Sequence, residues 1–255
     1  MSIGGMATME AGAFGAAVGF DPEALGTLIS YVNMVEFTED TGRVRTVTEQ
    51  AADDAIPDLW ESDTGANRPV AVLADVNFNG LDTCKSQVGD VLHIESPGQF
   101  TSPPPTVMDL SDFTYAMTVR FGTLAAGNSE LFTEDYSGSN STIYVGTAGD
   151  LLYWNGSGAT SLSATGVFSD DTTYVLVVKR TSGAFLAYLD GVDVTTGSPS
   201  EAGSMAAQML CRASGGDITF AHALQFSEAM ALADINTLGQ GLTDAVGLSD
   251  TWELS

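Results

Sequence analysis

Apolar and polar residues alternate along much of the second half of the chain, with the period of two that a half-buried strand requires. The clearest run is 113–121, where each second residue from Phe113 to Phe121 is apolar and lies on one face. The run 173–179 is nearly all apolar, which predicts a strand covered on both faces. Asp190-Gly191 predicts a hairpin turn, because such turns favour residues that adopt positive φ.

Shorter runs of the same kind recur along the chain and are separated by turn residues. We expect further strands at 35–38, 43–48, 69–73, 91–95, 130–133, 141–145, 151–154, 184–189, 192–194, 209–212 and 217–222. One amphipathic helix is expected near the end, with Ser227 as its N-cap and Gly239 as its stop. Many short strands with one late helix predict a sandwich of two sheets.

The order of these elements resembles the laminin G-like, concanavalin A-like lectin/glucanase superfamily. The long strand FTYAMTVRF precedes the short strand ELFTE, the hairpin STIYVGTAGDLLYWNG and the pair TYVLVVKRTSGAFLAYLDGVDV. In that pair, Asp190-Gly191 occupies the Y-x-D-G turn of the family. The resemblance implies an all-β fold: an antiparallel jelly-roll β-sandwich with one short C-terminal helix and an extended N-terminal arm. It indicates fold more directly than function.

The first half is similar to a looser pattern in such domains from viral and bacterial surface proteins, including those of phage virions. The matching features are a DTGRV turn, an NRP step, an NG turn and a GDVL strand, at 40–44, 67–69, 79–80 and 89–92. We therefore expect the sandwich domain to cover residues 25–255 and a separate N-terminal arm to cover 1–24.

The arm combines Gly and Ala with regularly spaced apolar side chains. These are Ile3, Met6, Met9, Phe14, Val18 and Phe20. The segment is too rich in Gly for a stable isolated helix and too apolar for an ordinary solvated tail. We expect it to become ordered against a neighbouring subunit or partner; a disordered terminus is the alternative. Because no basic region precedes the apolar residues, we expect no signal peptide and synthesis in the host cytoplasm.

The charge balance restricts the expected partners. The chain has 33 acidic and 8 basic residues, which gives a formal net charge of −25. Such a surface repels phosphate backbones and anionic membranes, so neither nucleic acid nor a membrane is expected as a partner. Cys84 and Cys211 are the two cysteines, and either a bridge or two buried thiols fits their spacing.

Hydrolytic chemistry is not expected, although some relatives of the implied fold are glycoside hydrolases. Retaining members need closely spaced carboxylates on one strand, of the form Glu-x-Asp-x-(x)-Glu. Glu130 and Glu134 lie on one face of their strand but have no Asp between them. No Ser/His/Asp arrangement and no Gly-rich phosphate loop is apparent, so we expect a protein that is not an enzyme.

A calcium site and a glycan site are the two candidate ligand sites. Asp75, Asn77, Asn79 and Asp82 alternate as at the start of a calcium loop. However, Ser86 occupies the position where such a loop needs a bidentate Glu, and Asn79-Gly80 is equally a plain turn. No other cofactor is expected.

A glycan site needs an aromatic stacking surface beside polar side chains. Tyr136, Tyr153 and Trp154 lie next to Ser-, Gly- and Asn-rich loops and are the candidate stacking residues, with a core or interface position as the alternative for Trp154.

Two functions fit these features. The first is a structural protein of a virion surface, namely a head decoration, head fibre or tail-associated protein of a tailed phage, attached by its arm. It would form a homo-oligomer, with a trimer favoured, and bind other virion proteins such as the capsid or tail. The alternative is a carbohydrate-binding adhesion module, calcium-assisted or not, whose partner is a host surface glycan.

Overall fold

The structure is a computed structural model. It describes residues 22–40, 43–49, 54–57, 85–86, 89–94, 99–100, 111–133, 141–203, 205, 209–214 and 218–255. Residues 1–21 of the predicted arm, the predicted calcium loop, Tyr136 and Cys84 lie outside these ranges, as does the expected strand at 69–73.

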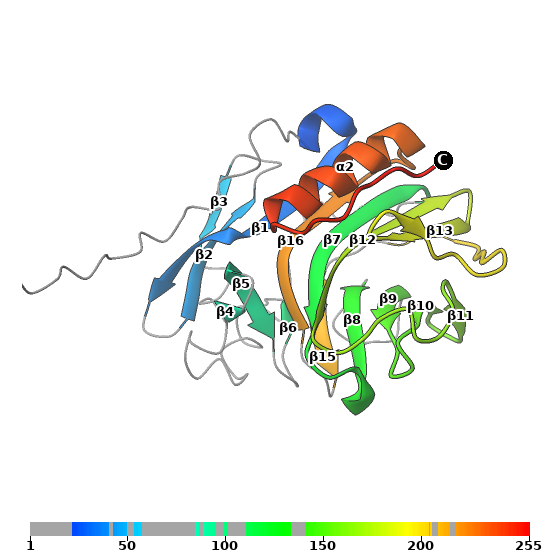
Figure 1. The fold of residues 1–255 in the computed structure, drawn as a ribbon, viewed down its shortest axis with the longest axis horizontal. Helices are drawn as coiled ribbons and strands as arrows, with labels where there is room; N and C mark the ends of the chain where they lie inside the picture. The colour runs from blue at the N-terminus through cyan, green and yellow to red at the C-terminus, as the bar shows by residue number, and fades with distance from the viewer. Residues whose placement is uncertain are drawn as a thin grey trace, which may run out of the picture.

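The described strands form two antiparallel sheets, so the all-β sandwich predicted from the sequence is confirmed (Figure 1). The large sheet has ten of them: β14 (Val192–Asp193), β13 (Ala184–Leu189), β12 (Thr172–Thr181), β7 (Phe113–Phe121), β16 (Ile218–Phe226), β1 (Leu28–Asp40), β2 (Arg43–Glu49) and β3 (Asp54–Pro57) in spatial order, with β5 (Gly89–Ile94) beside β16 and β4 (Lys85–Ser86) beside β5. The small sheet has six: β11 (Ala159–Ser161), β10 (Leu151–Asn155), β9 (Ser141–Val145), β8 (Asn128–Thr133), β15 (Met209–Ser214) and β6 (Gln99–Phe100).

The described helices are η1 (Pro22–Leu25), η4 (Leu124–Ala126) and α2 (Leu232–Ala245), of which the first two are single 3₁₀ turns. None of the helices in the described ranges is long and apolar enough to cross a membrane.

The main core fills the space between the two sheets. It contains the predicted face of β7, from Phe113 to Phe121, packed against Phe132 and Tyr153 of the small sheet. Phe113 and Tyr115 stack with their ring centroids 4.1 Å apart. Offset stacking of this kind favours aromatic pairs beyond the area that they bury.

A buried guanidinium lies at one end of this core. Arg180 is fully buried, and its guanidinium carbon lies 5.4 Å from the centre of the Phe185 ring. Its Nη2 donates to the carbonyl oxygens of Glu201 and Gly203 at 2.7 and 2.6 Å. Arg180 therefore ties the loop around residue 201 to the end of β12.

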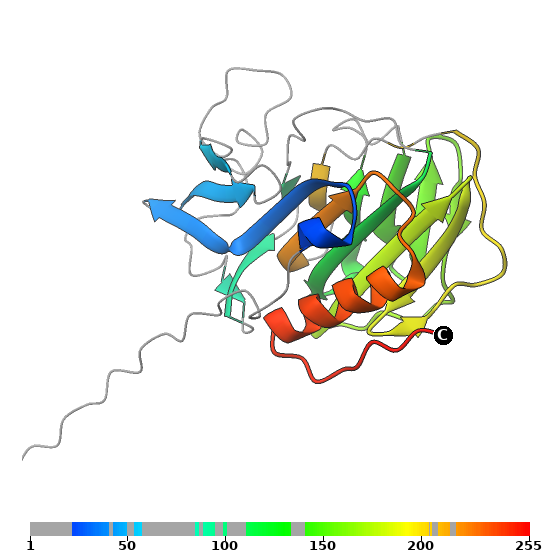
Figure 2. The same cartoon turned by 90° about the horizontal axis from the view of Figure 1, so that it is seen from above.

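A second apolar layer covers the outer face of the large sheet. In Figures 1 and 2, α2 and the C-terminal segment lie across this face, which makes the molecule three layers deep there. The layer contains Val175 and Val177 of β12 with Leu238 and Leu242 of α2. The two layers explain why β12 is apolar at nearly every position. Its alternate side chains face the sandwich core on one side and the helix on the other.

The helix begins later than the sequence predicts. Its N-cap is Ala231, not Ser227, and Ala231 makes no side-chain cap. Ser227 instead donates its backbone N–H to the carbonyl of Thr27 at 3.0 Å, and Glu228 Oε1 accepts the Thr27 N–H at 2.6 Å. These two residues therefore fasten the segment that precedes β1, and the helix starts after them.

The helix also continues through its predicted stop. Gly239 lies in the middle of α2, where a Cβ would come within 2.1 Å of the Trp252 ring. Trp252 donates its indole N–H to Thr243 Oγ1 at 3.0 Å and its backbone N–H to Gln240 Oε1 at 3.1 Å. Gly239 is needed for the close approach of the C-terminal segment to the helix, and not for a C-cap.

Candidate functional site

The outer face of the small sheet carries the candidate site. In β10, Leu151 and Tyr153 point into the core, so the alternation of the strand directs Leu152 and Trp154 outward. Leu152 and Trp154 are half-buried, whereas Tyr153 is 1% exposed and its hydroxyl donates to Ser141 Oγ at 3.0 Å. Of the predicted stacking residues, Trp154 is therefore at the surface, and Tyr153 is in the core.

Tyr144 of β9 lies on the same outer face and was missed by the sequence interpretation. Its neighbours Ile143 and Val145 are fully buried, so the alternation of β9 directs Tyr144 outward, where it is half-buried. The register places Tyr144 opposite Leu152, and Trp154 opposite Thr142 on the next outward pair. Because diagonal neighbours within a sheet lie about 7–8 Å apart, the two aromatic side chains occupy one contiguous patch.

Two carboxylates flank the ring of Tyr144. Glu130 of β8 is its register partner on the other side, and Asp150 lies in the turn between β9 and β10. A Cβ at Gly146 would come within 2.7 Å of Asp150 Oδ1, so Gly146 is what allows this carboxylate to fold over the sheet. We call the set Glu130, Tyr144, Asp150, Leu152 and Trp154 the outer patch.

The electrostatics of the outer patch keep its phenol neutral. Burial, followed by the charges of Asp150 and Glu130, raises the pKa of Tyr144 above its ordinary value. A phenol in this environment stays protonated at neutral pH and is a hydrogen-bond donor. It is the opposite of an activated nucleophile, whose pKa would be lowered.

Trp154 exposes carbon rather than its polar atom. Its Nε1 is buried and has no hydrogen-bond partner among the described residues, so the part of the indole that reaches the surface is apolar. The strand end that bears it is held in place by Asn155, whose Nδ2 donates to Glu201 Oε2 at 3.0 Å. Asn155 Oδ1 also accepts the backbone N–H groups of Ser157 and Gly158 at 3.0 and 2.9 Å, which fixes the hairpin.

Comparisons with known proteins give a likeness in fold. A scan against protein-family models finds no match, and a search among curated proteins finds no relative. Among solved structures, the ligand-binding domain of botulinum neurotoxin serotype D, in complex with N-acetylneuraminic acid, is similar with a TM-score of 0.56. The identity is 7%, over 84% of this chain and 51% of that chain.

The sialidase of Trypanosoma rangeli is also similar. Its complex with 2,3-difluoro-KDN matches with a TM-score of 0.56 and 12% identity, over 88% of this chain and 33% of the sialidase. Its complex with sialic acid matches with a TM-score of 0.51 and 14% identity, over 88% and 34%. The chain thus spans one third to one half of the length of these proteins. Its fold is that of a lectin-like β-sandwich.

The metal site predicted from the sequence stays a prediction, because Asp75, Asn77, Asn79 and Asp82 lie outside the described ranges. Within those ranges, no group of three or more His, Cys, Asp or Glu residues is placed to hold a metal ion. Asp171 is bound to Arg120 at 2.8 Å, and Asp170 Oδ1 accepts the Leu124 N–H at 2.8 Å. Both carboxylates therefore hold the loop before β12 in place.

Proposed function

We propose that this chain is a non-enzymatic lectin-like module that binds a neutral glycan on the outer patch. The observation that supports this proposal most directly is the presence of two half-buried aromatic residues, Tyr144 and Trp154, on one face, with two carboxylates beside Tyr144. The apolar ring surface of Trp154 suits the C–H face of a sugar, and the carboxylates beside Tyr144 suit sugar hydroxyls, which donate hydrogen bonds.

The charge of the patch determines which sugars it would accept. Glu130 and Asp150 are acidic, and the chain has a net charge of −25. A sugar that bears a carboxylate would be repelled by both the local and the overall field. N-acetylneuraminic acid, the sugar in the neurotoxin complex, is therefore a poor ligand for this patch in spite of the common fold.

A glycan array with neutral and sialylated glycans, probed with and without a chelator, tests the proposal. We expect neutral glycans to bind and sialylated ones to be weak. Trp154→Ala should weaken binding by about 30-fold, the effect of a central aromatic contact, and Tyr144→Phe by a smaller factor. Leu186→Ala removes an exposed apolar side chain from the large sheet and should leave binding unchanged. Failure of every glycan to bind, or unchanged binding by Trp154→Ala, would refute the proposal.

The chelator distinguishes two forms of the glycan proposal. Loss of binding with chelator would indicate a calcium-assisted site and would make Asp75, Asn77, Asn79 and Asp82 the first residues to substitute. Unchanged binding would indicate that the outer patch acts without a metal.

We also propose an assembly role for the arm, which would place the module on a virion surface as a homo-oligomer with other virion proteins. The support is the apolar pattern from Ile3 to Phe20. Deletion of residues 1–20 should leave a folded sandwich that no longer joins its assembly. Normal assembly of the truncated protein would refute this role and leave glycan binding unaffected.

A further inference from the structure

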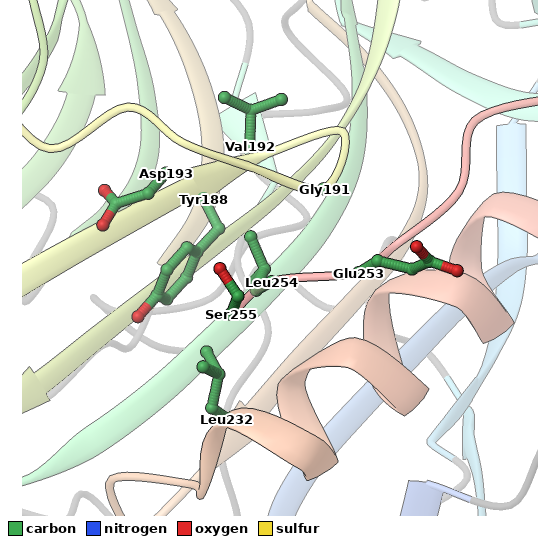
Figure 3. A pocket seen from close by; sticks show the side chains of 8 residues that line it. All are labelled: Tyr188, Gly191, Val192, Asp193, Leu232, Glu253, Leu254 and Ser255. Atoms are coloured by element: carbon green, nitrogen blue, oxygen red, sulfur yellow. The ribbon is translucent and has the colours of Figure 1, made fainter.

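A pocket lies at the edge of the large sheet, where β13 and β14 meet α2 and the C-terminal segment. It has a volume of about 270 Å³, and its walls include Tyr188, Val192, Asp193, Leu232, Glu253 and Leu254. In Figure 3 the Tyr188 ring points into the space that Leu232 and Leu254 border, with Asp193 beside it and Glu253 on the far side.

The walls of the pocket are fixed before any ligand arrives. Two hydrogen bonds with Asn236 hold Leu254 against α2. The Leu254 N–H donates to Asn236 Oδ1 at 2.9 Å, and the Leu254 carbonyl accepts from Asn236 Nδ2 at 3.1 Å. On the sheet side, a Cβ at Gly191 would come within 2.6 Å of the Thr251 carbonyl, so the hairpin turn packs directly on the C-terminal segment. A preformed pocket binds without the cost of ordering its walls.

Tyr188 provides a phenol hydroxyl at the pocket. Its side chain is only 5% exposed, and its hydroxyl makes no hydrogen bond among the described residues. Burial, followed by the charge of Asp193, raises its pKa, so the phenol is neutral and its oxygen has lone pairs available. The Tyr188 oxygen can therefore accept a hydrogen bond from a ligand that enters the pocket.

Charge and shape together define the ligand. The walls bear the carboxylates of Asp193 and Glu253, and no basic side chain lines the pocket, so an anion is repelled. Within the described residues, no group of three acidic or histidine ligands is placed to hold a metal ion. Leu232, Leu254 and the 59%-exposed Val192 provide an apolar entrance. An ammonium has three donors and no acceptor, which matches a carboxylate and a phenol oxygen.

We propose that this pocket binds an alkylammonium group, with the cation between Asp193 and Tyr188 and the aliphatic stem against Leu232 and Leu254. The group has two sources, a free aliphatic amine or the lysine side chain of a partner protein. The site is independent of the proposed glycan function, because the outer patch lies on the other sheet.

Titration of the intact protein with n-pentylamine and with the blocked peptide acetyl-Gly-Lys-Gly-amide, followed by NMR chemical shifts, tests the proposal. We expect dissociation constants on the order of 1 mM, as for a ligand of a few heavy atoms, with the shifts confined to the pocket. Binding of pentylamine alone indicates a free amine, and binding of the blocked peptide through its lysine indicates a partner side chain; both support the proposal. Equal binding of n-pentanol, or no shift with either amine at 20-fold this concentration (about 20 mM), would overturn it.

Two conservative variants keep the test independent of folding. Asp193→Asn retains the acceptor that receives the Thr195 N–H at 2.9 Å but removes the charge, and should weaken amine binding about tenfold. Tyr188→Phe should weaken it several-fold. Asp244→Asn is the matched control, since it removes one negative charge from the exposed end of α2. If Asp193→Asn and Asp244→Asn weaken binding equally, the attraction is that of the whole acidic surface, and the pocket proposal is wrong.

Discussion

Replacement of Asp190 by Asn should stabilise the protein at neutral and alkaline pH. Asp190 occupies the turn between β13 and β14 with a φ of 49°, and its Oδ1 accepts the Val175 N–H at 2.7 Å. Burial, with a smaller contribution from the charge of Asp250, raises its pKa from 3.8 to about 6, against the lowering effect of that hydrogen bond. Asn keeps the acceptor, tolerates positive φ and removes the charge.

The sign of the effect follows from the direction of the pKa shift. The folded state holds the Asp190 proton more tightly than the unfolded state, so stability from this group is full below pH 3.8 and is lost as the pH rises through about 6. A shift of about two units corresponds to at most about 3 kcal/mol. Because Asp190 is partly exposed, solvent screening reduces this, and we expect about 1–2 kcal/mol.

The measurement is the difference in the free energy of unfolding between Asp190→Asn and the parent protein, from urea titrations at pH 4, 6 and 8. The difference should be near zero at pH 4 and reach about 1–2 kcal/mol in favour of the variant at pH 8. Asp190→Ala, which leaves the Val175 N–H without its acceptor, should be less stable than the parent at each pH. A difference between Asp190→Asn and the parent that does not change with pH would refute the reasoning.

Three further predictions concern the interior. Burial lowers the pKa of His222 from 6.5 to about 4. The stability that the neutral imidazole contributes is therefore present above pH 6.5 and is lost as the pH falls toward 4. In the same titrations, His222→Gln should lose less stability than the parent protein between pH 6.5 and 4. Gly239→Ala should lower the thermal midpoint, with a cost of about 1–3 kcal/mol, although Ala favours helices, because its methyl group would collide with Trp252. Arg180→Met should destabilise by about 1–3 kcal/mol in urea titrations, because two carbonyl oxygens lose their donor.

The strands of the second half could be predicted from the sequence because their burial is local and periodic. The bounds of β7 match the prediction, and the apolar run of β12 is buried on both faces as expected. The helix bounds could not be predicted, since both depend on distant residues. Thr27 binds Ser227, the residue that was expected to cap the helix, and Trp252 requires the glycine that was expected to end it.

The candidate site was predicted only in part, and the reason is geometric. Tyr153 and Trp154 are adjacent in the sequence, so a strand must direct them to opposite faces, and only Trp154 reaches the surface. The same alternation, applied to β9, would have identified Tyr144 between two apolar core residues. The approach of Asp150 to this ring depends on how its turn folds over Gly146, which no local pattern indicates.

The two proposed sites impose a common limit on what this lectin-like sandwich binds. The outer patch and the pocket lie on different sheets, yet both place carboxylates beside a tyrosine that burial and acidic neighbours keep neutral. Such a pairing accepts groups that donate hydrogen bonds, namely sugar hydroxyls on the patch and an ammonium group in the pocket, and it repels anions. Because the sites share no residue, Trp154→Ala and Asp193→Asn should each weaken one kind of binding and spare the other. If both proposals hold, the local charge of each site, and not the fold shared with the sialic-acid complexes, selects the ligand.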